Sequence, residues 1–179
     1  MSKGRPVGAG VRPNQEEMTE AEDSSSPPPP MASIDRTLHA LGFQYTLISP
    51  GKLTGRLKVT ETCCQPFDVL NGGVSALVAE SVASLGAYVA SGFRRVAGVQ
   101  LCTNHVKAAL LGEEVEAEAK PIQVGGAIQV WEVQIRKIDP SPSGSKALLS
   151  TSKVTLLCYR QAPHSVKDYA ETIKKYAKL

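Results

Sequence analysis

The residue best suited to chemistry in this chain is Glu80, a lone carboxylate within a long apolar segment. From residue 69 to residue 93 the chain has one Glu and no Lys, Arg, Asp or His. A helix that is apolar on every side is typically enclosed by protein. An enclosed carboxylate costs several kcal/mol unless it is paired, hydrogen-bonded or neutralised. We therefore expect Glu80 to be enclosed and kept for chemistry, with a structural ion pair to a partner subunit as the alternative.

Helical spacing surrounds Glu80 with groups that act on a carbonyl. Ser84 lies one turn after it, and Gly72 and Gly73 lie two turns before it, at the positive end of the helix dipole. Backbone N–H groups there can stabilise an oxyanion, and glycine lets a ligand come close. Gln65, ahead of the helix, adds a neutral donor and acceptor. This set suits attack on an activated carbonyl, while Ser84 as a packing residue and Gln65 as a cap are the structural alternatives.

Local patterns predict the elements that position these groups. Asn71 is a good N-cap for a helix over 71–91, and Gly92 follows its end. Ser33 is the expected cap of a short helix over 34–41, and 166–176 has the spacing of a surface helix. Alternating apolar residues predict strands over 53–60, 114–122 and 128–138, and the residue types also favour strands over 43–48, 96–105 and 148–159. With few long crossovers, this order predicts an α+β fold in which an antiparallel sheet wraps one central helix.

Composition predicts one domain with a tail at each end. Residues 1–31 contain six of the twelve prolines and few large apolar side chains, so we expect disorder there. The domain spans 32–162, and 163–179 forms a C-terminal helix and tail. A formal net charge of +3 is too small to predict nucleic-acid binding. The mid-segment glutamate makes a membrane span unfavourable, although about 20 residues would be long enough.

The cysteines bear on metal binding, and the C-terminus bears on the cellular location of the protein. The spacing of the four cysteines fits neither a zinc site nor a disulfide framework, so we expect reduced, mostly buried thiols and no metal site. They are Cys63, Cys64, Cys102 and Cys158. The ending Ala177-Lys178-Leu179 resembles the Ser-Lys-Leu signal read by the peroxisomal import receptor, and predicts a peroxisomal location. A chance ending of a basic helix is the alternative.

The run from residue 67 to residue 81 resembles the motif of the hot-dog-fold acyl-CoA thioesterases. In that family a (His or Asn)-Gly-Gly opens the central helix and a glutamate follows about two turns later, as Asn71-Gly72-Gly73 and Glu80 do here. The segments 98–105 and 130–133 extend the resemblance, which covers roughly 34–160. With its Ala-Lys-Leu ending, the chain is most similar to the plant peroxisomal 1,4-dihydroxy-2-naphthoyl-CoA thioesterases of phylloquinone synthesis.

The resemblance implies a role for each matching residue. Glu80 would be nucleophile or general base, the Gly72 N–H would polarise the thioester carbonyl, and Gln65 would lie near that carbonyl. Ser84 would position the glutamate or a water, and Asn71 would act as a hydrogen-bond donor where many members have histidine. The implied reaction is hydrolysis of an acyl- or aroyl-CoA thioester without a cofactor. The implied assembly is a homo-oligomer with sites between subunits, as a dimer or a dimer of dimers.

Six further residues are candidates for substrate contacts. Arg94, Arg95 and Lys107 can hold CoA phosphates, although each is also a common type of solvated surface residue. Gly125 and Gly126 lie where members of the family often carry polar or basic residues that touch CoA. His105 is a further candidate, although a histidine on a strand is more often structural. Two other functions remain open at this point. A hot-dog hydratase would place histidine where Asn71 stands, and a non-catalytic acyl-CoA-binding module has the same fold.

Overall fold

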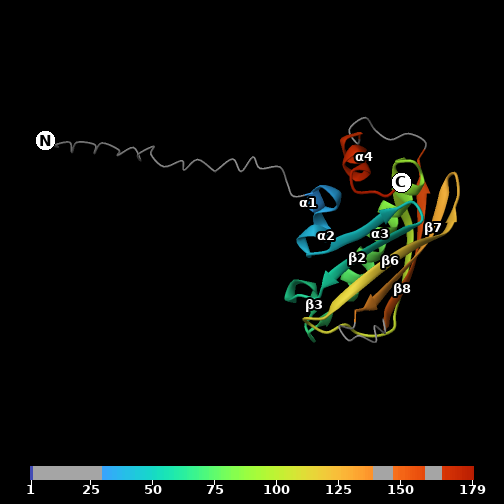
Figure 1. Cartoon of the computed structure of the whole chain (residues 1–179). Helices are drawn as coiled ribbons and strands as arrows, with labels where there is room; N and C mark the ends of the chain where they lie inside the picture. The colour runs from blue at the N-terminus through green and yellow to red at the C-terminus, as the bar shows by residue number, and fades with distance from the viewer. Residues whose placement is uncertain (2–29, 139–146, 160–166) are drawn as a thin grey trace.

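The fold is an antiparallel sheet with one long helix across its inner face (Figure 1). The computed structural model describes residue 1 and residues 30–138, 147–159 and 167–179. The sheet has six strands in the order β1-β2-β6-β7-β8-β5, so β1 and β5 are its edges. The strands are β1 Gln44–Ser49, β2 Lys52–Lys58, β5 Val96–His105, β6 Glu114–Val124, β7 Ile128–Lys137 and β8 Leu148–Cys158. Each lies within two residues of its expected bounds.

The central helix α3, Gly72–Ala90, begins and ends as the sequence predicts. The Asn71 side chain accepts a hydrogen bond from the Gly73 N–H at 2.8 Å, so it is the N-cap. At the other end Gly92 has a φ of 73°, a left-handed conformation that glycine adopts without strain. Of the described helices, α3 is the one long and apolar enough to cross a membrane. Its packing against the sheet accounts for that composition.

Small residues let α3 lie close to the sheet. Ala79, Ala83 and Ala87 are fully buried, and a Cβ at Gly86 would lie 2.6 Å from Cζ3 of Trp131. A buried hydrogen-bond chain also joins the two layers. The Trp131 indole donates to Gln129 Oε1 at 2.9 Å, and Gln129 Nε2 donates to the Ala87 carbonyl at 3.2 Å. The position of α3 on the sheet is therefore set by both packing and polar contacts.

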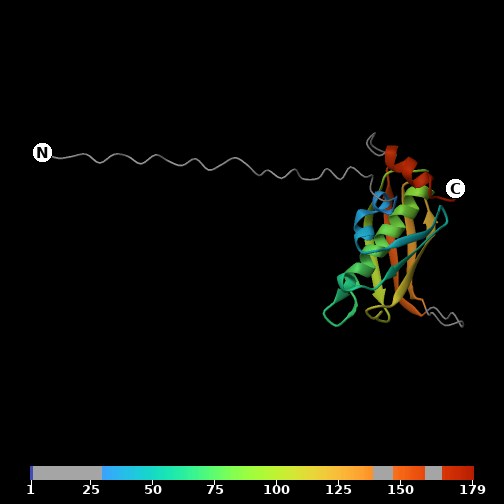
Figure 2. The ribbon, with the colours of Figure 1, turned by 60° about the vertical axis from the view of Figure 1, so that its left-hand side comes forward.

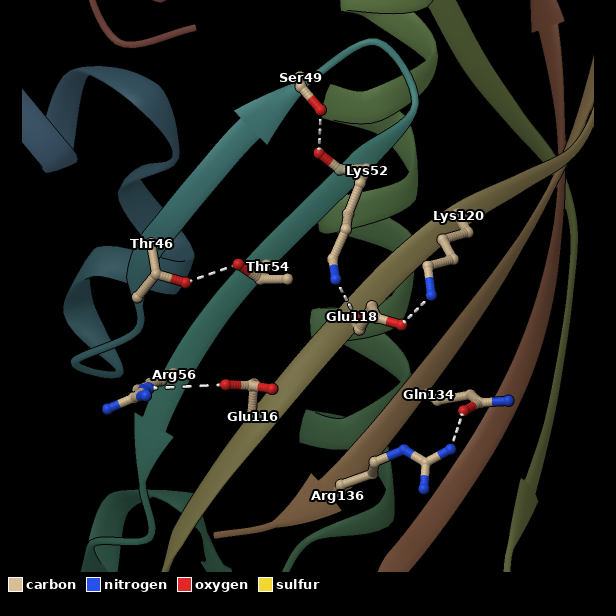
Figure 3. A network of polar contacts seen from close by, with 10 residues as sticks. All are labelled: Thr46, Ser49, Lys52, Thr54, Arg56, Glu116, Glu118, Lys120, Gln134 and Arg136. Atoms are coloured by element: carbon tan, nitrogen blue, oxygen red, sulfur yellow. Dashed lines mark hydrogen bonds and ion pairs between the residues drawn. The ribbon is translucent and has the colours of Figure 1, made fainter. Parts of the chain in front are cut away.

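The face of the sheet turned away from α3 is polar (Figure 3). Glu118 lies between Lys52 and Lys120, and Arg56 faces Glu116 across β2 and β6. The sheet therefore covers only one side of α3, and the apolar core lies between these two layers. The expected antiparallel sheet around one central helix is confirmed, whereas the expectation that protein encloses this helix on every side is wrong for the single chain, because Glu80 is exposed.

Short elements lie at the two ends of α3 (Figure 2). The hairpin β3 Cys64–Gln65 and β4 Val69–Leu70, preceded by the 3-10 turn η1 Glu61–Cys63, is joined to its N-terminal end. The helices α1 Pro30–Ile34, α2 Arg36–Ala40 and α4 Lys167–Lys174 lie beside its C-terminal half.

The single helix expected over 34–41 is wrong. Asp35 is extended, with a φ of −149°, and its side chain accepts from the Leu38 N–H, so Asp35 rather than Ser33 caps the second helix. The expected loop over 139–144 and most of the expected tail over 1–31 lie outside the described residues.

Candidate active site

Glu80 is exposed on the open side of α3, which corrects the expectation that it would be enclosed. Its carboxylate extends over Gly98 on β5, where a Cβ would lie 2.2 Å from Glu80 Oε1. The carboxylate thus occupies space that is available because residue 98 has no side chain. An exposed position also removes the need for a buried counter-ion and leaves the carboxylate accessible to a substrate.

Glu80 lines a cavity of about 460 Å³, which we call the Glu80 cavity. One wall is a stripe of α3 that includes Leu77, Ser84 and Tyr88, spaced so that they share a helix face. The opposite end is formed by Tyr45 of β1, Asp35 and Tyr169. The volume lies within the range of small-molecule sites.

Aromatic and polar groups meet at this second end of the cavity. The Tyr88 and Tyr169 ring centroids are 5.4 Å apart, and the Tyr169 hydroxyl donates to the Ile34 carbonyl at 3.0 Å. Burial, followed by the Asp35 charge and then Tyr88, raises the pKa of Tyr169 to about 12. Burial, followed by Asp35 and then Tyr169, raises the pKa of Tyr45 well above its ordinary value.

Two other predicted catalytic groups, Gly72 and Gln65, line a second cavity of about 350 Å³, which we call the Gly72 cavity. It contains Gln65, Gly72, His105 and Lys107. The His105 ring covers the helix start, since a Cβ at Gly72 would lie 3.1 Å from His105 Nε2. Gln65 Oε1 accepts from the Phe67 N–H at 3.2 Å, which holds its side chain at the hairpin.

Within one chain the two halves of the predicted site are separate. Glu80 follows Gly72 by eight residues, about 12 Å along the helix axis, and the two residues line different cavities. Both halves lie along β5, because Glu80 extends over Gly98 near one end of this strand and Gly72 faces His105 at the other. β5 is an edge of the sheet.

The predicted basic residues differ in their contacts. Arg94 Nε donates to the Ser91 carbonyl at 3.1 Å and so completes the end of α3 rather than lining either cavity. Arg95 lines the Glu80 cavity, and its guanidinium lies 5.3 Å from the Tyr159 ring centroid. Lys107 is exposed at the Gly72 cavity. Arg95 and Lys107 therefore remain candidates for the CoA phosphates.

Three predicted site residues lie at a helix cap or in a turn: Asn71, Gly125 and Gly126. Asn71 caps α3 and is not among the described residues that line either cavity. Gly125 and Gly126 lie between β6 and β7, where the Gly125 N–H donates to the Ile128 carbonyl at 2.9 Å. A Cβ at Gly125 would lie 2.5 Å from that carbonyl oxygen, which explains this glycine by turn geometry.

Sequence reasoning missed the far end of the Glu80 cavity. Tyr45, Asp35 and Tyr169 come from segments up to 134 residues apart, and none carries a local motif. An alternating strand predicts which residues share a face, but not which of them faces a cavity. Among the described residues, no three His, Cys, Asp or Glu side chains come together as a metal ligand set.

The antiparallel sheet, the central helix that begins with Gly72-Gly73 and the Glu80 carboxylate on that helix are the features of a hot-dog thioesterase. The thioesterase superfamily model matches residues 67–142. The chain is 49% identical over 150 residues to 1,4-dihydroxy-2-naphthoyl-CoA thioesterase 2 of Arabidopsis thaliana. This alignment covers 83% of this chain and 96% of that protein. The chain belongs to the thioesterase superfamily, and the expected enzyme class, a thioester hydrolase, is confirmed.

Bacterial proteins extend the comparison. The 1,4-dihydroxy-2-naphthoyl-CoA hydrolase of Escherichia coli is 33% identical over 96 residues, which is 53% of this chain and 70% of that protein. A crystal structure of a thioesterase from Haemophilus influenzae is 30% identical with a TM-score of 0.61, covering 72% of this chain and 85% of that one. The expected hot-dog fold is thereby confirmed.

Proposed function

We propose that the protein hydrolyses aroyl-CoA thioesters, with 1,4-dihydroxy-2-naphthoyl-CoA as its substrate in phylloquinone synthesis. The observation that carries this proposal is the Glu80 cavity, where an accessible carboxylate faces a chamber with three tyrosines at its far end. Aromatic walls suit an aromatic acyl group. The names of the plant and bacterial relatives support the same substrate.

In the proposed reaction Glu80 acts on the thioester carbonyl. As general base it would take a proton from water while the water oxygen attacks the carbonyl carbon; as nucleophile it would form a mixed anhydride that water then cleaves. In both routes the carbonyl oxygen becomes an oxyanion, which the N–H groups at a helix start stabilise. The oxyanion then collapses and the C–S bond breaks. In the general-base route the proton that Glu80 took from water passes to the sulfur, and in the nucleophile route CoA leaves as a thiolate that takes a proton from solvent. Ser84, one turn from Glu80 on the same wall, would position the carboxylate or the water.

We also propose that each complete site forms between two chains that join at their β5 edges. Paired with β8, Gly98 faces Leu156, Cys102 faces Lys153 and His105 faces Ser150, so Cys102 lies midway between the other two. Two β5 strands paired antiparallel about Cys102 would bring Gly98 of one chain opposite His105 of the other. Glu80 and Ser84 would then lie beside Gly72 and Gln65 of the second chain. Two such dimers would form the expected tetramer.

Release of free CoA tests the reaction. We expect the protein to release CoA, detected by a thiol reagent, from dihydroxynaphthoyl-CoA faster than from benzoyl-CoA or a long-chain acyl-CoA. Glu80→Gln should lower turnover by at least about 100-fold and leave the melting temperature unchanged, because the side chain is exposed. Binding without release would favour a non-catalytic acyl-CoA-binding module. Preference for the long-chain substrate would favour a general acyl-CoA thioesterase.

Mixing two inactive variants tests whether the site is shared between chains. Glu80→Ala and Gln65→Ala remove groups from different cavities. After the chains are mixed and exchanged, a shared site predicts mixed dimers with one complete site, so activity should return. A site within one chain predicts no recovery, since every chain would still lack one group.

We further propose that the protein is peroxisomal. Lys178 and Leu179 are exposed, and the Lys178 N–H donates to the Ile48 carbonyl at 2.8 Å. The import receptor would therefore have to displace one main-chain hydrogen bond to take the tail in extended form. A fluorescent protein fused ahead of the full chain should enter peroxisomes, and removal of residues 177–179 should leave it in the cytosol. Unchanged import after that deletion would refute the signal.

A further inference from the structure

The Tyr45 hydroxyl is a buried polar group without a partner. Its oxygen is inaccessible to solvent, and it forms no hydrogen bond within the part of the chain that the structure describes. A buried hydroxyl that lacks a partner weakens a fold. Phenylalanine would fill the same place without that cost, so the hydroxyl points to a ligand that completes it.

The surroundings of this hydroxyl suit a hydroxylated aromatic ring. Tyr45 lines the Glu80 cavity together with Tyr88 and Tyr169, whose rings form an aromatic wall. The Asp35 carboxylate lines the same end of the cavity. One oxygen of Asp35 accepts from the Leu38 N–H at 2.9 Å, which holds the carboxylate in place. Tyrosine can donate and accept, whereas an ionised carboxylate accepts.

The distance from Glu80 suits a ring system attached to the reacting carbonyl. Tyr88 packs on Tyr169 and lies eight residues after Glu80, about 12 Å along the helix axis. Ser84 lies halfway between them on the same wall. A thioester carbonyl at Glu80 would therefore direct its acyl group along α3 toward the tyrosines, with the CoA portion on the opposite side.

We propose that Tyr45 is a specificity-determining residue that hydrogen-bonds a ring hydroxyl of the acyl group. This inference rests on the proposed function and specifies its substrate class, hydroxylated aroyl-CoA thioesters. An unsubstituted ring would leave the Tyr45 hydroxyl unpaired, and a site built around a hydrogen bond discriminates strongly against a substrate that lacks it. The residues that form this end of the cavity, Asp35, Tyr45 and Tyr169, lie outside the segment 67–142 that matches the superfamily.

The test compares two substrates that differ only in their ring hydroxyls. The value of kcat/KM is measured for 1,4-dihydroxy-2-naphthoyl-CoA and for 2-naphthoyl-CoA with the native protein, Tyr45→Phe and Tyr176→Phe. We expect Tyr45→Phe to reduce the ratio of the two values by about 10- to 100-fold. Its melting temperature should be equal to or above that of the native protein, because it removes an unpaired buried hydroxyl. Tyr176→Phe, an exposed tyrosine outside this cavity, should keep the native ratio.

Two results would overturn the inference. One is an unchanged ratio in Tyr45→Phe, and the other is an equal loss on both substrates, which would show a general effect on the cavity. If the native protein released CoA from neither substrate, the proposed function would fail, and binding would still decide the inference. Calorimetry with the free acids should then show 1,4-dihydroxy-2-naphthoic acid bound more tightly than 2-naphthoic acid by the native protein, with that preference lost in Tyr45→Phe.

Discussion

At the scale of single residues, the position of the Glu80 carboxylate depends on the absence of a side chain at Gly98. Glu80 Oε1 lies where a Cβ at Gly98 would otherwise be, 2.2 Å away. The neighbour of the proposed catalytic carboxylate is therefore a strand glycine that has no reactive side chain. Gly98 belonged to the segments that resemble the family, yet its contact with Glu80 follows only from the packing of α3 against β5.

Gly98→Ala should reduce turnover with little effect on folding. The new methyl group would displace the end of the Glu80 side chain, and misplacing a catalytic group by about 1 Å costs up to about 100-fold in rate. We expect kcat to fall by about 10- to 100-fold while the urea midpoint changes little, because an exposed side chain can move aside. Gly51→Ala, a turn glycine with nothing within 4 Å, is the matched control. Full activity in Gly98→Ala would show that the carboxylate position is not critical.

At the scale of elements, α3 joins the core to the site because its two sides differ. One side bears alanines and Gly86 against the sheet, and the other bears Glu80, Ser84 and Tyr88 along the cavity. The close approach at Gly86 thus determines where Glu80 lies relative to β5. Helix position and site geometry are coupled through packing.

Gly86→Ala should destabilise the fold although alanine is the better helix former. Its Cβ would lie 2.6 Å from Trp131 Cζ3 and 3.1 Å from Leu53 Cδ1, both buried. Overpacking of this kind costs about 1–3 kcal/mol, against a gain in helix propensity of about 1 kcal/mol. Urea unfolding should show a net loss of up to about 2 kcal/mol. Ser81→Ala, on the open side of the same helix, should be neutral or slightly stabilising; a stabilised Gly86→Ala would contradict the close packing.

At the scale of the whole molecule, the outer face of the sheet and its β5 edge differ in character. The outer face is covered with ion pairs, whereas the β5 edge lies beside both halves of the site. A row of unpaired strand groups at an edge is a template for pairing with another chain. The proposed dimer uses this edge to complete the site.

Oxidation should link two chains through Cys102. This cysteine is exposed at the midpoint between Gly98 and His105 on β5, so antiparallel pairing of two β5 strands about this point places the two thiols opposite each other. Directly opposed residues lie about 4.5–5.5 Å apart between Cα atoms, within the range of a disulfide. A mild oxidant should give a covalent dimer in denaturing electrophoresis. Cys102→Ser should abolish it, and a dimer that persists in this variant would argue against the β5 pairing.

The sequence by itself determined the elements and the chemistry that they carry. Every long strand is predicted to within two residues, three of them from alternation with period two, and Asn71 and Gly92 mark the ends of α3. These signals are local, because strand faces and helix caps depend on a few neighbouring residues. The order of the elements then predicts an antiparallel sheet with one helix. The Gly72-Gly73 and Glu80 spacing predicts attack on an activated carbonyl, which the family resemblance specifies as a thioester.

Only the tertiary structure decided where those groups lie relative to one another. An apolar helix carries the same pattern whether its sides face a sheet, a cavity or a second chain, so the pattern did not reveal that Glu80 is exposed. The pattern also did not reveal that Glu80 and Gly72 line different cavities, or that Tyr45 lines the same cavity as Asp35 and Tyr169. Burial is a property of neighbours distant in sequence, and a sheet that covers one side of a helix leaves the other side for a ligand.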